Sequence, residues 1–182
     1  MLDRQSNKLK KLINDLVEAS KASTGNVSVA LMPVNAVELL SQSVAEYSDR
    51  IADANLTPII SAPEEAVIMA DGKLLWRVFD NALGNICKYS QAFTRVYINI
   101  TEDETTYTIC FKNISKDSLS ISPDELMQRF VRGDSARTTE GSGLGLSIAQ
   151  SLTELQGGTF GIDIDGDLFK VNICMNKAEK EQ

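Results

Sequence analysis

Residues 137–150 read Arg137-Thr-Thr-Glu-Gly-Ser-Gly-Leu-Gly-Leu-Ser-Ile-Ala-Gln150, a polar loop with three glycines that leads directly into an apolar-periodic segment. The apolar residues recur every three or four positions, which is typical of one buried helix face; they are Leu144, Ile148, Leu152 and Leu155. Glycines let a ligand approach the backbone closely, and a helix N-terminus offers N–H groups at the positive end of its dipole. The stretch therefore predicts an anion site suited to phosphate, with a plain tight turn as the alternative.

A second segment, residues 71–90, predicts one long helix. Asp71 is a good N-cap because its carboxylate accepts hydrogen bonds from first-turn N–H groups. The apolar face of this helix would consist of Leu74, Leu75, Val78, Leu83 and Ile86. On a different stripe, Asn81, Asn85 and Lys88 recur at i, i+4 and i+7. Because asparagine is a mediocre helix former, this alignment calls for a reason other than helix formation.

The chemistry of that stripe suits a metal-bound phosphate. A carboxamide oxygen is a hard neutral ligand for Mg²⁺, which holds few protein ligands and takes the rest from water and phosphate. Lys88 would add a point charge for the phosphates. A solvated polar helix face with a coincidental asparagine pair is the alternative interpretation.

Together these segments resemble the ATP-binding catalytic domain of two-component sensor histidine kinases, in the superfamily shared with gyrase, Hsp90 and the MutL mismatch-repair proteins. Residues 77–90 are similar to the N box of that family, residues 126–134 to its F box, and residues 141–146 to its second glycine box. The three motifs also come in the family's order and spacing, and the resemblance covers nearly the whole chain.

The resemblance implies a two-layer α/β (α+β) sandwich of the Bergerat ATP-binding type, in which helices cover one face of a mixed, mostly antiparallel sheet. Residues 26–182 would form this ATP-binding catalytic domain, with an ATP lid at residues 115–142. Residues 1–25 carry an apolar stripe on a charged helix and would be the C-terminal part of the second helix of a dimerisation bundle. From the pattern alone, a helix packed on its own domain is equally acceptable.

The hydrophobic pattern also predicts the remaining elements. We expect strands at 27–34, 58–61, 66–70, 95–101 and 106–113, and a helix over 36–55. A closing hairpin of 160–164 and 168–174 is expected around Asp165-Gly166. The polar span at 115–142 holds a single short helical piece, at 123–130, and loops of that length are uncommon unless they are functional or disordered.

Carried over residue by residue, the resemblance implies a Mg-ATP site between the asparagine-bearing helix and the lid. Asn85 would be the Mg²⁺ ligand, and Asn81 would assist it one turn earlier through water or phosphate. Lys88 and Arg132 would contact phosphate and complete the catalytic set, while Tyr89 would flank the nucleotide. The other nucleotide-binding positions would be Asn113, Arg137, Gly141, Gly143, Leu144 and Gly145. For the two arginines, ordinary solvated surface charge is the alternative.

One position departs from the family pattern. The family has an Asp-x-Gly-x-Gly run before the lid, whose aspartate accepts a hydrogen bond from the adenine amino group. Here Asn113 stands in place of the aspartate, Ser115 in place of the first glycine, and the second glycine is missing. An asparagine oxygen still accepts from an amino group, but a neutral bond is weaker by about 1 kcal/mol, which lowers affinity several-fold.

The chain contains no histidine. Because the family transfers the γ-phosphoryl group of ATP to a histidine on the first bundle helix, we expect this chain to bind ATP without autophosphorylating. We also expect it to be a truncated piece from the cytoplasmic part of a membrane-anchored bacterial sensor kinase. The implied partners are a second copy of the parent protein through the N-terminal helix, the helix with the phosphoacceptor histidine, and a response regulator.

Composition agrees with a single domain that does not bind nucleic acid. A chain of 182 residues can bury a sizeable core, and a net charge of −7 argues against non-specific binding to nucleic acid. The cysteines, Cys87, Cys110 and Cys174, are predicted to be buried free thiols. No apolar run is long enough to span a bilayer.

Two other functions remain open at this point. A regulatory module of the same fold would bind nucleotide weakly or not at all, as the departure at Asn113 allows. An anti-sigma-type serine kinase relative would share the nucleotide fold but would not need the leading helix.

Overall fold

A five-stranded sheet forms one layer of the molecule, with strand order β2-β4-β5-β7-β6. The computed structural model describes residues 28–119, 122, 125 and 144–179. The strands of this sheet are β2 (Thr57–Ser61), β4 (Arg95–Glu102), β5 (Thr106–Ile114), β7 (Leu168–Asn176) and β6 (Thr159–Asp165). Only the pair of β2 and β4 is parallel, and the other pairs are antiparallel. The predicted mixed, mostly antiparallel sheet is confirmed.

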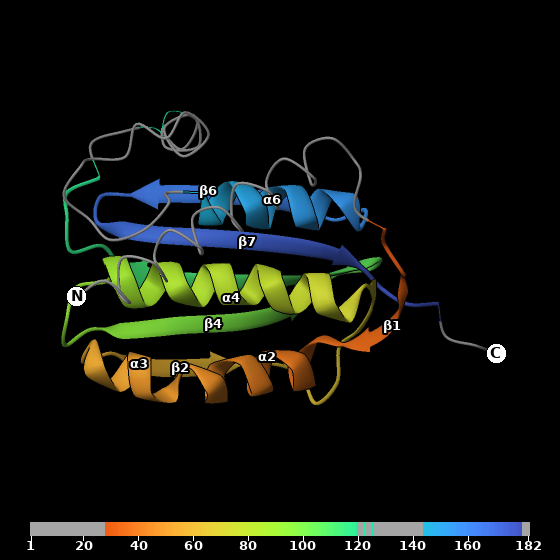
Figure 1. The fold of residues 1–182 in the computed structure, drawn as a ribbon, viewed down its shortest axis with the longest axis horizontal. Coiled ribbons are helices and arrows are strands. Elements are labelled where there is room, and N and C mark those ends of the chain that lie inside the picture. The colour runs from red at the N-terminus through yellow and green to blue at the C-terminus, as the bar shows by residue number, and fades with distance from the viewer. Residues whose placement is uncertain (1–27, 120–121, 123–124, 126–143, 180–182) are drawn as a thin grey trace, which may run out of the picture.

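The helices lie together on one face of this sheet, as Figure 1 shows. They are α2 (Ala36–Glu46), α3 (Ser48–Asp53), α4 (Gly72–Tyr89) and α6 (Gly145–Leu155). A separate two-stranded antiparallel sheet pairs β1 (Met32–Asn35) with β3 (Val67–Ala70). The predicted two-layer sandwich is therefore confirmed, with one helical layer and one sheet layer.

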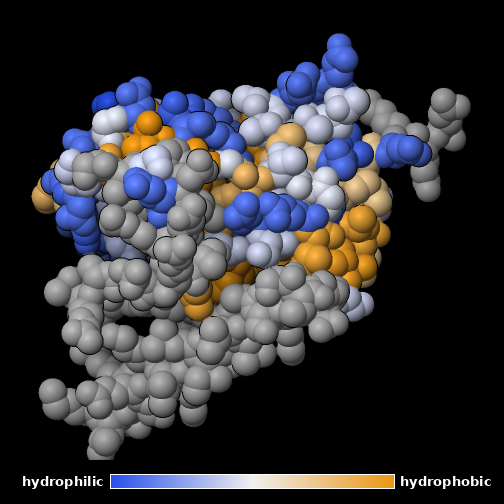
Figure 2. All heavy atoms as spheres, turned by 90° about the horizontal axis from the view of Figure 1, so that it is seen from above, coloured by the Kyte–Doolittle hydropathy of each residue, from blue (hydrophilic) through white to orange (hydrophobic). Residues whose placement is uncertain are grey.

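Side chains alternate between the two faces of the sheet as a strand period of two requires. Val96, Ile98 and Ile100 of β4 are buried toward the helices, and β7 buries Phe169, Val171, Ile173 and Met175 in the same way. The opposite face is polar: the register places Lys112 of β5 opposite Tyr97 of β4 and Lys170 of β7. The upper side of Figure 2, which is this uncovered face of the sheet, is mostly hydrophilic.

The core between the layers is built mainly from α4. Its buried residues are Leu75, Val78, Phe79, Ala82, Leu83 and Ile86, of which Phe79 and Ala82 were absent from the predicted apolar face. The predicted face residue Leu74 is only partly buried. The Phe79 ring meets that of Phe111 at 5.9 Å between centroids, tilted by 56°, an arrangement that aromatic pairs favour.

Two predicted elements differ in extent. The predicted helix over 36–55 is two helices, α2 and α3, which are separated at Tyr47. Tyr47 is only 6% exposed, because its side chain turns inward to α4, and this contact is long-range and therefore not visible in local periodicity. The predicted strand at 27–34 is shorter, since β1 spans only Met32–Asn35 and matches its four-residue partner β3. The remaining strand ends agree with the prediction to within two residues.

Two helix ends are closed by specific hydrogen bonds. At the C-terminus of α6, Gly157 has a φ of +78°, its N–H donates to the Glu154 carbonyl, and the Gly158 N–H donates to the Thr153 carbonyl. This Schellman-type ending needs the left-handed conformation that glycine adopts without strain. The buried Gln156 then joins two helices: its Oε1 accepts from the Asp71 N–H at 2.9 Å, and its Nε2 donates to the Leu152 carbonyl at 2.8 Å.

Asp71 caps α4 as predicted. Its Oδ1 accepts from the N–H groups of Lys73 and Leu74 at 3.0 and 3.3 Å, and its Oδ2 accepts from the Ala30 N–H at 3.0 Å. Desolvation acts to raise the pKa of this carboxyl, but the three backbone donors together hold the pKa below its ordinary value.

The Asp71→Ala variant is expected to lower the free energy of unfolding by about 1–2 kcal/mol, because the first turn of α4 loses its cap. Urea denaturation at neutral pH measures this loss, with Glu64→Ala as a charge-matched variant of an exposed loop residue. Equal midpoints for the two variants would contradict the role given to the cap.

Several sequence predictions fall partly or wholly outside the described residues. They are the bundle helix at 1–25, most of the lid at 115–142, the helical piece at 123–130 and the F box at 126–134. All three cysteines are free, but only Cys110 is buried, and Cys87 and Cys174 are half-buried. Within the described residues, no helix combines the length and the apolar character needed to cross a membrane.

Candidate functional site

The asparagine stripe of α4 and the glycine-led start of α6 lie side by side. A Cβ atom added at Gly145 would lie 3.1 Å from Asn81 Oδ1. At the other end of the same pair, Gln156 after α6 contacts Asp71 before α4, so the two helices run antiparallel. The first turn of α6 therefore opens toward the part of α4 that carries the predicted metal and phosphate residues.

The two asparagines of the stripe have different surroundings. Asn81 Nδ2 donates to the Arg77 carbonyl at 2.9 Å, which leaves Oδ1 toward Gly145. Asn85, one turn further along α4, is half-buried, and its side chain makes no hydrogen bond to any other described residue. A carboxamide oxygen in this state is available to a ligand, and its chemistry fits Mg²⁺.

Two lysines gather around Tyr89 at the C-terminal end of α4. Lys88 Nζ donates to the Tyr89 hydroxyl at 2.8 Å and lies 4.6 Å from the centre of the ring. Lys116 Nζ donates to the Lys88 carbonyl at 2.8 Å and lies 5.9 Å from the same ring. The predicted phosphate contact Lys88 and the predicted flanking residue Tyr89 thus form a cationic end of the site, to which Lys116 adds a charge that sequence reasoning missed.

The end of β5 is joined to the end of α4. Ser90 and Ser115 form an isolated antiparallel bridge, the Gln91 N–H donates to the Ile114 carbonyl at 2.8 Å, and the Lys116 N–H donates to the Tyr89 carbonyl at 2.9 Å. These bonds bring Asn113, the predicted adenine contact, to the edge of the asparagine stripe. Asn113 is 3% exposed.

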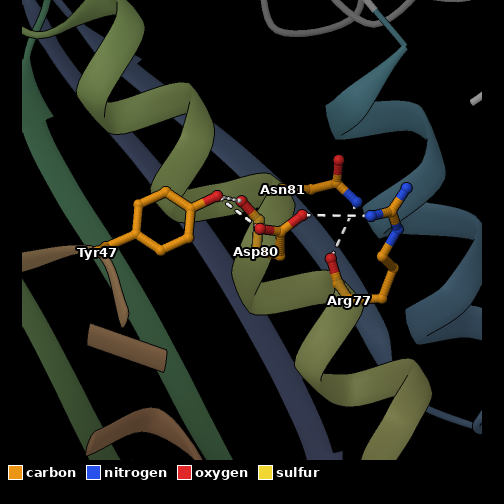
Figure 3. A network of polar contacts seen from close by, with 4 residues as sticks. All are labelled: Tyr47, Arg77, Asp80 and Asn81. Carbon is orange, nitrogen blue, oxygen red and sulfur yellow. Dashed lines mark hydrogen bonds and ion pairs between the residues drawn. The ribbon is translucent and has the colours of Figure 1, made fainter. Parts of the chain in front are cut away.

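A second polar network, which sequence reasoning missed, lies along an adjacent stripe of α4 (Figure 3). The Tyr47 hydroxyl donates to Asp80, with its oxygen 2.6 Å from Oδ1 and 3.0 Å from the Asp80 carbonyl oxygen. Arg77 pairs with Oδ2 of the same carboxylate at 3.3 Å. Gly84 makes room for this contact, since a Cβ there would lie 3.3 Å from the Tyr47 hydroxyl. A glycine inside a helix lowers helix stability by about 1 kcal/mol relative to alanine. Gly84 was therefore the one signal in the sequence that another side chain approaches α4 closely at this point.

This network connects the core to the site. The Arg77 side chain forms an ion pair with Asp80, and the Arg77 carbonyl accepts a hydrogen bond from Asn81 Nδ2. Tyr47 holds Asp80 from α2 and α3, so the turn of α4 that presents Asn81 is fixed from two sides. Burial raises the pKa of Tyr47 well above its ordinary value, and the neighbouring Asp80 carboxylate adds to this effect.

A pH dependence follows from that shift. The unfolded chain loses the Tyr47 proton above about pH 10 while the folded chain retains it, so the stability from this residue is complete below about pH 10. We expect it to decline as the pH rises further, by at most about 1.4 kcal/mol per pH unit. Urea denaturation between about pH 8 and 11 should show a shallower decline for Tyr47→Phe than for the wild type. Tyr97→Phe, on the uncovered sheet face, should follow the wild type, and parallel curves for Tyr47→Phe and the wild type would contradict the assignment.

The remaining predicted site residues divide into two groups. Leu144 and Gly145 lie at the start of α6, with Leu144 as its N-cap residue. Arg132, Arg137, Gly141 and Gly143 lie outside the described residues. Among the residues that the structure describes, no group of three or more acidic, cysteine or histidine side chains could hold a metal ion. A metal here would depend on few protein ligands, which is usual for Mg²⁺ bound with phosphates.

The fold and this arrangement agree with the predicted ATP-binding type of domain, and the sequence assigns the chain to a family. The chain belongs to the histidine kinase-, DNA gyrase B- and HSP90-like ATPase family, whose model matches residues 70–177. That region contains α4 with its asparagine stripe, β4 to β7 and α6. The predicted family resemblance is confirmed.

Sensor proteins are similar to the chain in sequence. The probable sensor protein PcoS of Escherichia coli is 28% identical over 173 residues, which cover 93% of this chain and 37% of PcoS. The signal transduction histidine-protein kinase BaeS of Escherichia coli strain K12 is 28% identical over 156 residues, which cover 82% of this chain and 32% of BaeS. The chain thus spans about a third of the length of these curated relatives.

Solved structures share the fold. The histidine kinase AdeS of Acinetobacter baumannii matches with a TM-score of 0.80 at 16% identity, over 98% of this chain and 83% of that one. Full-length ShkA in complex with AMPPNP matches at 0.79 and 22% identity, over 97% of this chain and 38% of that one. The histidine kinase ThkA in complex with the response regulator protein TrrA matches at 0.75 and 17% identity, over 99% and 50% of the two chains.

Proposed function

We propose that this chain is the ATP-binding catalytic part of a sensor histidine kinase and that it binds Mg-ATP between α4 and the start of α6. The observation that carries the proposal is the close approach of Asn81 to Gly145, the residue of the predicted glycine box at which α6 begins. Membership of the ATPase family and the similarity to sensor kinases support it.

Each described residue would have a separate task. Asn85, whose amide oxygen is uncommitted within the described part of the chain, would hold Mg²⁺, and Asn81 would assist from one turn earlier. Lys88 would turn from the Tyr89 hydroxyl to a phosphate oxygen, and Lys116 would keep the α4 end positive. When bound, Mg²⁺ neutralises phosphate charge, so the work of the protein in phosphoryl transfer is positioning and electrostatic stabilisation.

The phosphoryl acceptor would come from another segment, because this sequence has no histidine. In the proposed reaction the bond between the γ-phosphorus and the β–γ bridging oxygen breaks, a histidine nitrogen takes the phosphoryl group, and ADP leaves. By analogy with the complex of ThkA and TrrA, a response regulator would then receive the phosphoryl group. Arg132, Arg137, Gly141 and Gly143 would act from the lid side of the same site.

Calorimetric titration with ADP and ATP, first with Mg²⁺ and then with EDTA, tests the proposal. We expect dissociation constants of roughly micromolar to sub-millimolar that rise when the metal is removed. At about 100 times the dissociation constant, nucleotide should stabilise the fold by about 2.7 kcal/mol. No heat at millimolar nucleotide, together with an unchanged melting temperature, would contradict nucleotide binding.

That second outcome would favour the other candidate function, a regulatory module of the same fold. Asn113 and Ser115, where the family has an aspartate and a glycine, are the observation that supports this candidate. Nucleotide-independent binding of a partner would then be the expected activity.

A further inference from the structure

Two buried polar groups at the junction of α4 and β5 have no hydrogen-bond partner within the described residues. The first is the Asn113 carboxamide, on a residue that is only 3% exposed. The second is the Ser90 hydroxyl oxygen, which is fully buried. Leaving a fully buried group such as the Ser90 hydroxyl unpaired costs about 1–3 kcal/mol, so proteins rarely retain one without a ligand, an ion or a water nearby.

The two groups face the same side of the molecule. Ile109, Phe111 and Asn113 are every second residue of β5, so their side chains share one face of the strand. Ile109 and Phe111 are buried, so this is the face that the helices cover. Ser115 follows at the next position on that face and is bridged to Ser90. Paired residues of an antiparallel bridge place their side chains on one side, which brings Ser90 next to Asn113. The Asn113 and Ser90 side chains therefore form one polar spot at the C-terminal end of α4.

That spot is neutral and both donates and accepts. A carboxylate at position 113 would be an acceptor only, and it would suit a 6-aminopurine while repelling the oxygen of a 6-oxopurine. A carboxamide presents an oxygen and an NH₂ group, and rotating it by half a turn exchanges them. In one orientation it accepts from the amino group of adenine and donates to N1. In the other it donates to O6 of guanine and accepts from N1–H.

We infer that the site binds guanine nucleotides as well as adenine nucleotides, with Asn113 as the residue that removes the usual discrimination. This inference rests on the proposed nucleotide site and adds the identity of the base. The fully buried Ser90 hydroxyl does not reach a ligand itself, but it rotates to donate or to accept and so suits either orientation of the neighbouring carboxamide.

The test is calorimetric titration of the intact chain with ADP and with GDP, both in the presence of Mg²⁺. For the wild type, the two dissociation constants should agree within about tenfold. Asn113→Asp should retain ADP binding and weaken GDP binding by about 10- to 100-fold, because the acceptor-only carboxylate faces O6. Asn113→Leu should weaken both nucleotides together by about tenfold. Thermal unfolding of each variant without nucleotide serves as the control for folding.

The outcomes separate this inference from the proposed function. ADP binding with GDP weaker by more than about tenfold in the wild type would overturn the inference and leave the proposed function standing. A ratio of the two constants that is unchanged in Asn113→Asp would also overturn it, because selectivity would then come from elsewhere. Binding of neither nucleotide to the folded wild type would overturn the proposed function, and this inference with it.

Discussion

The Asn85→Ala variant is expected to lose the metal dependence of nucleotide binding and to bind Mg-ADP at least about tenfold more weakly than the wild type. The alanine has no side-chain oxygen to offer a cation, whereas the Asn85 carboxamide, one turn beyond Asn81 on α4, is half-buried and makes no hydrogen bond within the described residues. Folding should not suffer, because the Asn85 side chain makes no hydrogen bond within the described residues and alanine is the better helix former by up to about 0.7 kcal/mol. Loss of binding with retained stability would therefore point to the ligand site itself.

The measurement is a titration with ADP in Mg²⁺ and in EDTA, for the wild type and for two variants. Asn99→Ala is a matched control, because Asn99 lies on β4 with its side chain on the uncovered face, between the buried Ile98 and Ile100. It should bind as the wild type does. An Asn85→Ala protein in which EDTA still weakens binding as in the wild type would remove Asn85 from the metal site.

The Gly158→Ala variant is expected to lower the free energy of unfolding by about 3 kcal/mol, the largest effect on stability that we predict. An added Cβ would lie 2.6 Å from the Cys174 carbonyl oxygen, 2.5 Å from Met175 Sδ and 3.0 Å from Thr153 Cγ2. The methionine end can move, but the carbonyl belongs to β7 and is held by pairing with β5 and β6. Either the strand or the end of α6 must shift.

A second glycine provides the control for this prediction. Gly161 lies in β6, and a Cβ there would meet nothing within 4 Å. Gly161→Ala should leave stability unchanged or raise it by a few tenths of a kcal/mol, because alanine loses less conformational freedom on folding. Urea denaturation of both variants decides the matter, and similar midpoints would mean that α6 and β7 accommodate a methyl group.

Local features of the fold could be predicted from the sequence. The cap at Asp71, the long helix after it and the hairpin that turns at Gly166, whose φ is +58°, follow from short-range rules that name residues and positions. The two halves of the candidate site could also be predicted, because Asn81 and Gly145 each belong to a motif with its own chemistry. Their contact is a property of the antiparallel packing of α4 on α6.

Features that depend on distant contacts could not be predicted in this way. The hydrophobic pattern predicts a continuous helix across Tyr47, and it gives no sign of the long-range hydrogen bond from Tyr47 to Asp80 at the break between α2 and α3. The role of Gly84 depends on the Tyr47 hydroxyl that lies close to it. The role of Lys116 depends in the same way on the Tyr89 ring near its ammonium group. The burial of Ser90 and Asn113 likewise requires the bridge between α4 and β5, which joins residues far apart along the chain.

The carboxamide of Gln156 has a consequence for hydrogen–deuterium exchange. The backbone amide hydrogen of Asp71 would ordinarily exchange quickly, because the first N–H groups of a helix have no partner within the helix. Here it is held by a side chain that is 2% exposed and anchored on the last turn of α6. Deuterium can replace it only when α4 and α6 separate at that end or the whole domain opens. The exchange rate of this single amide thus reports how often the two helices come apart.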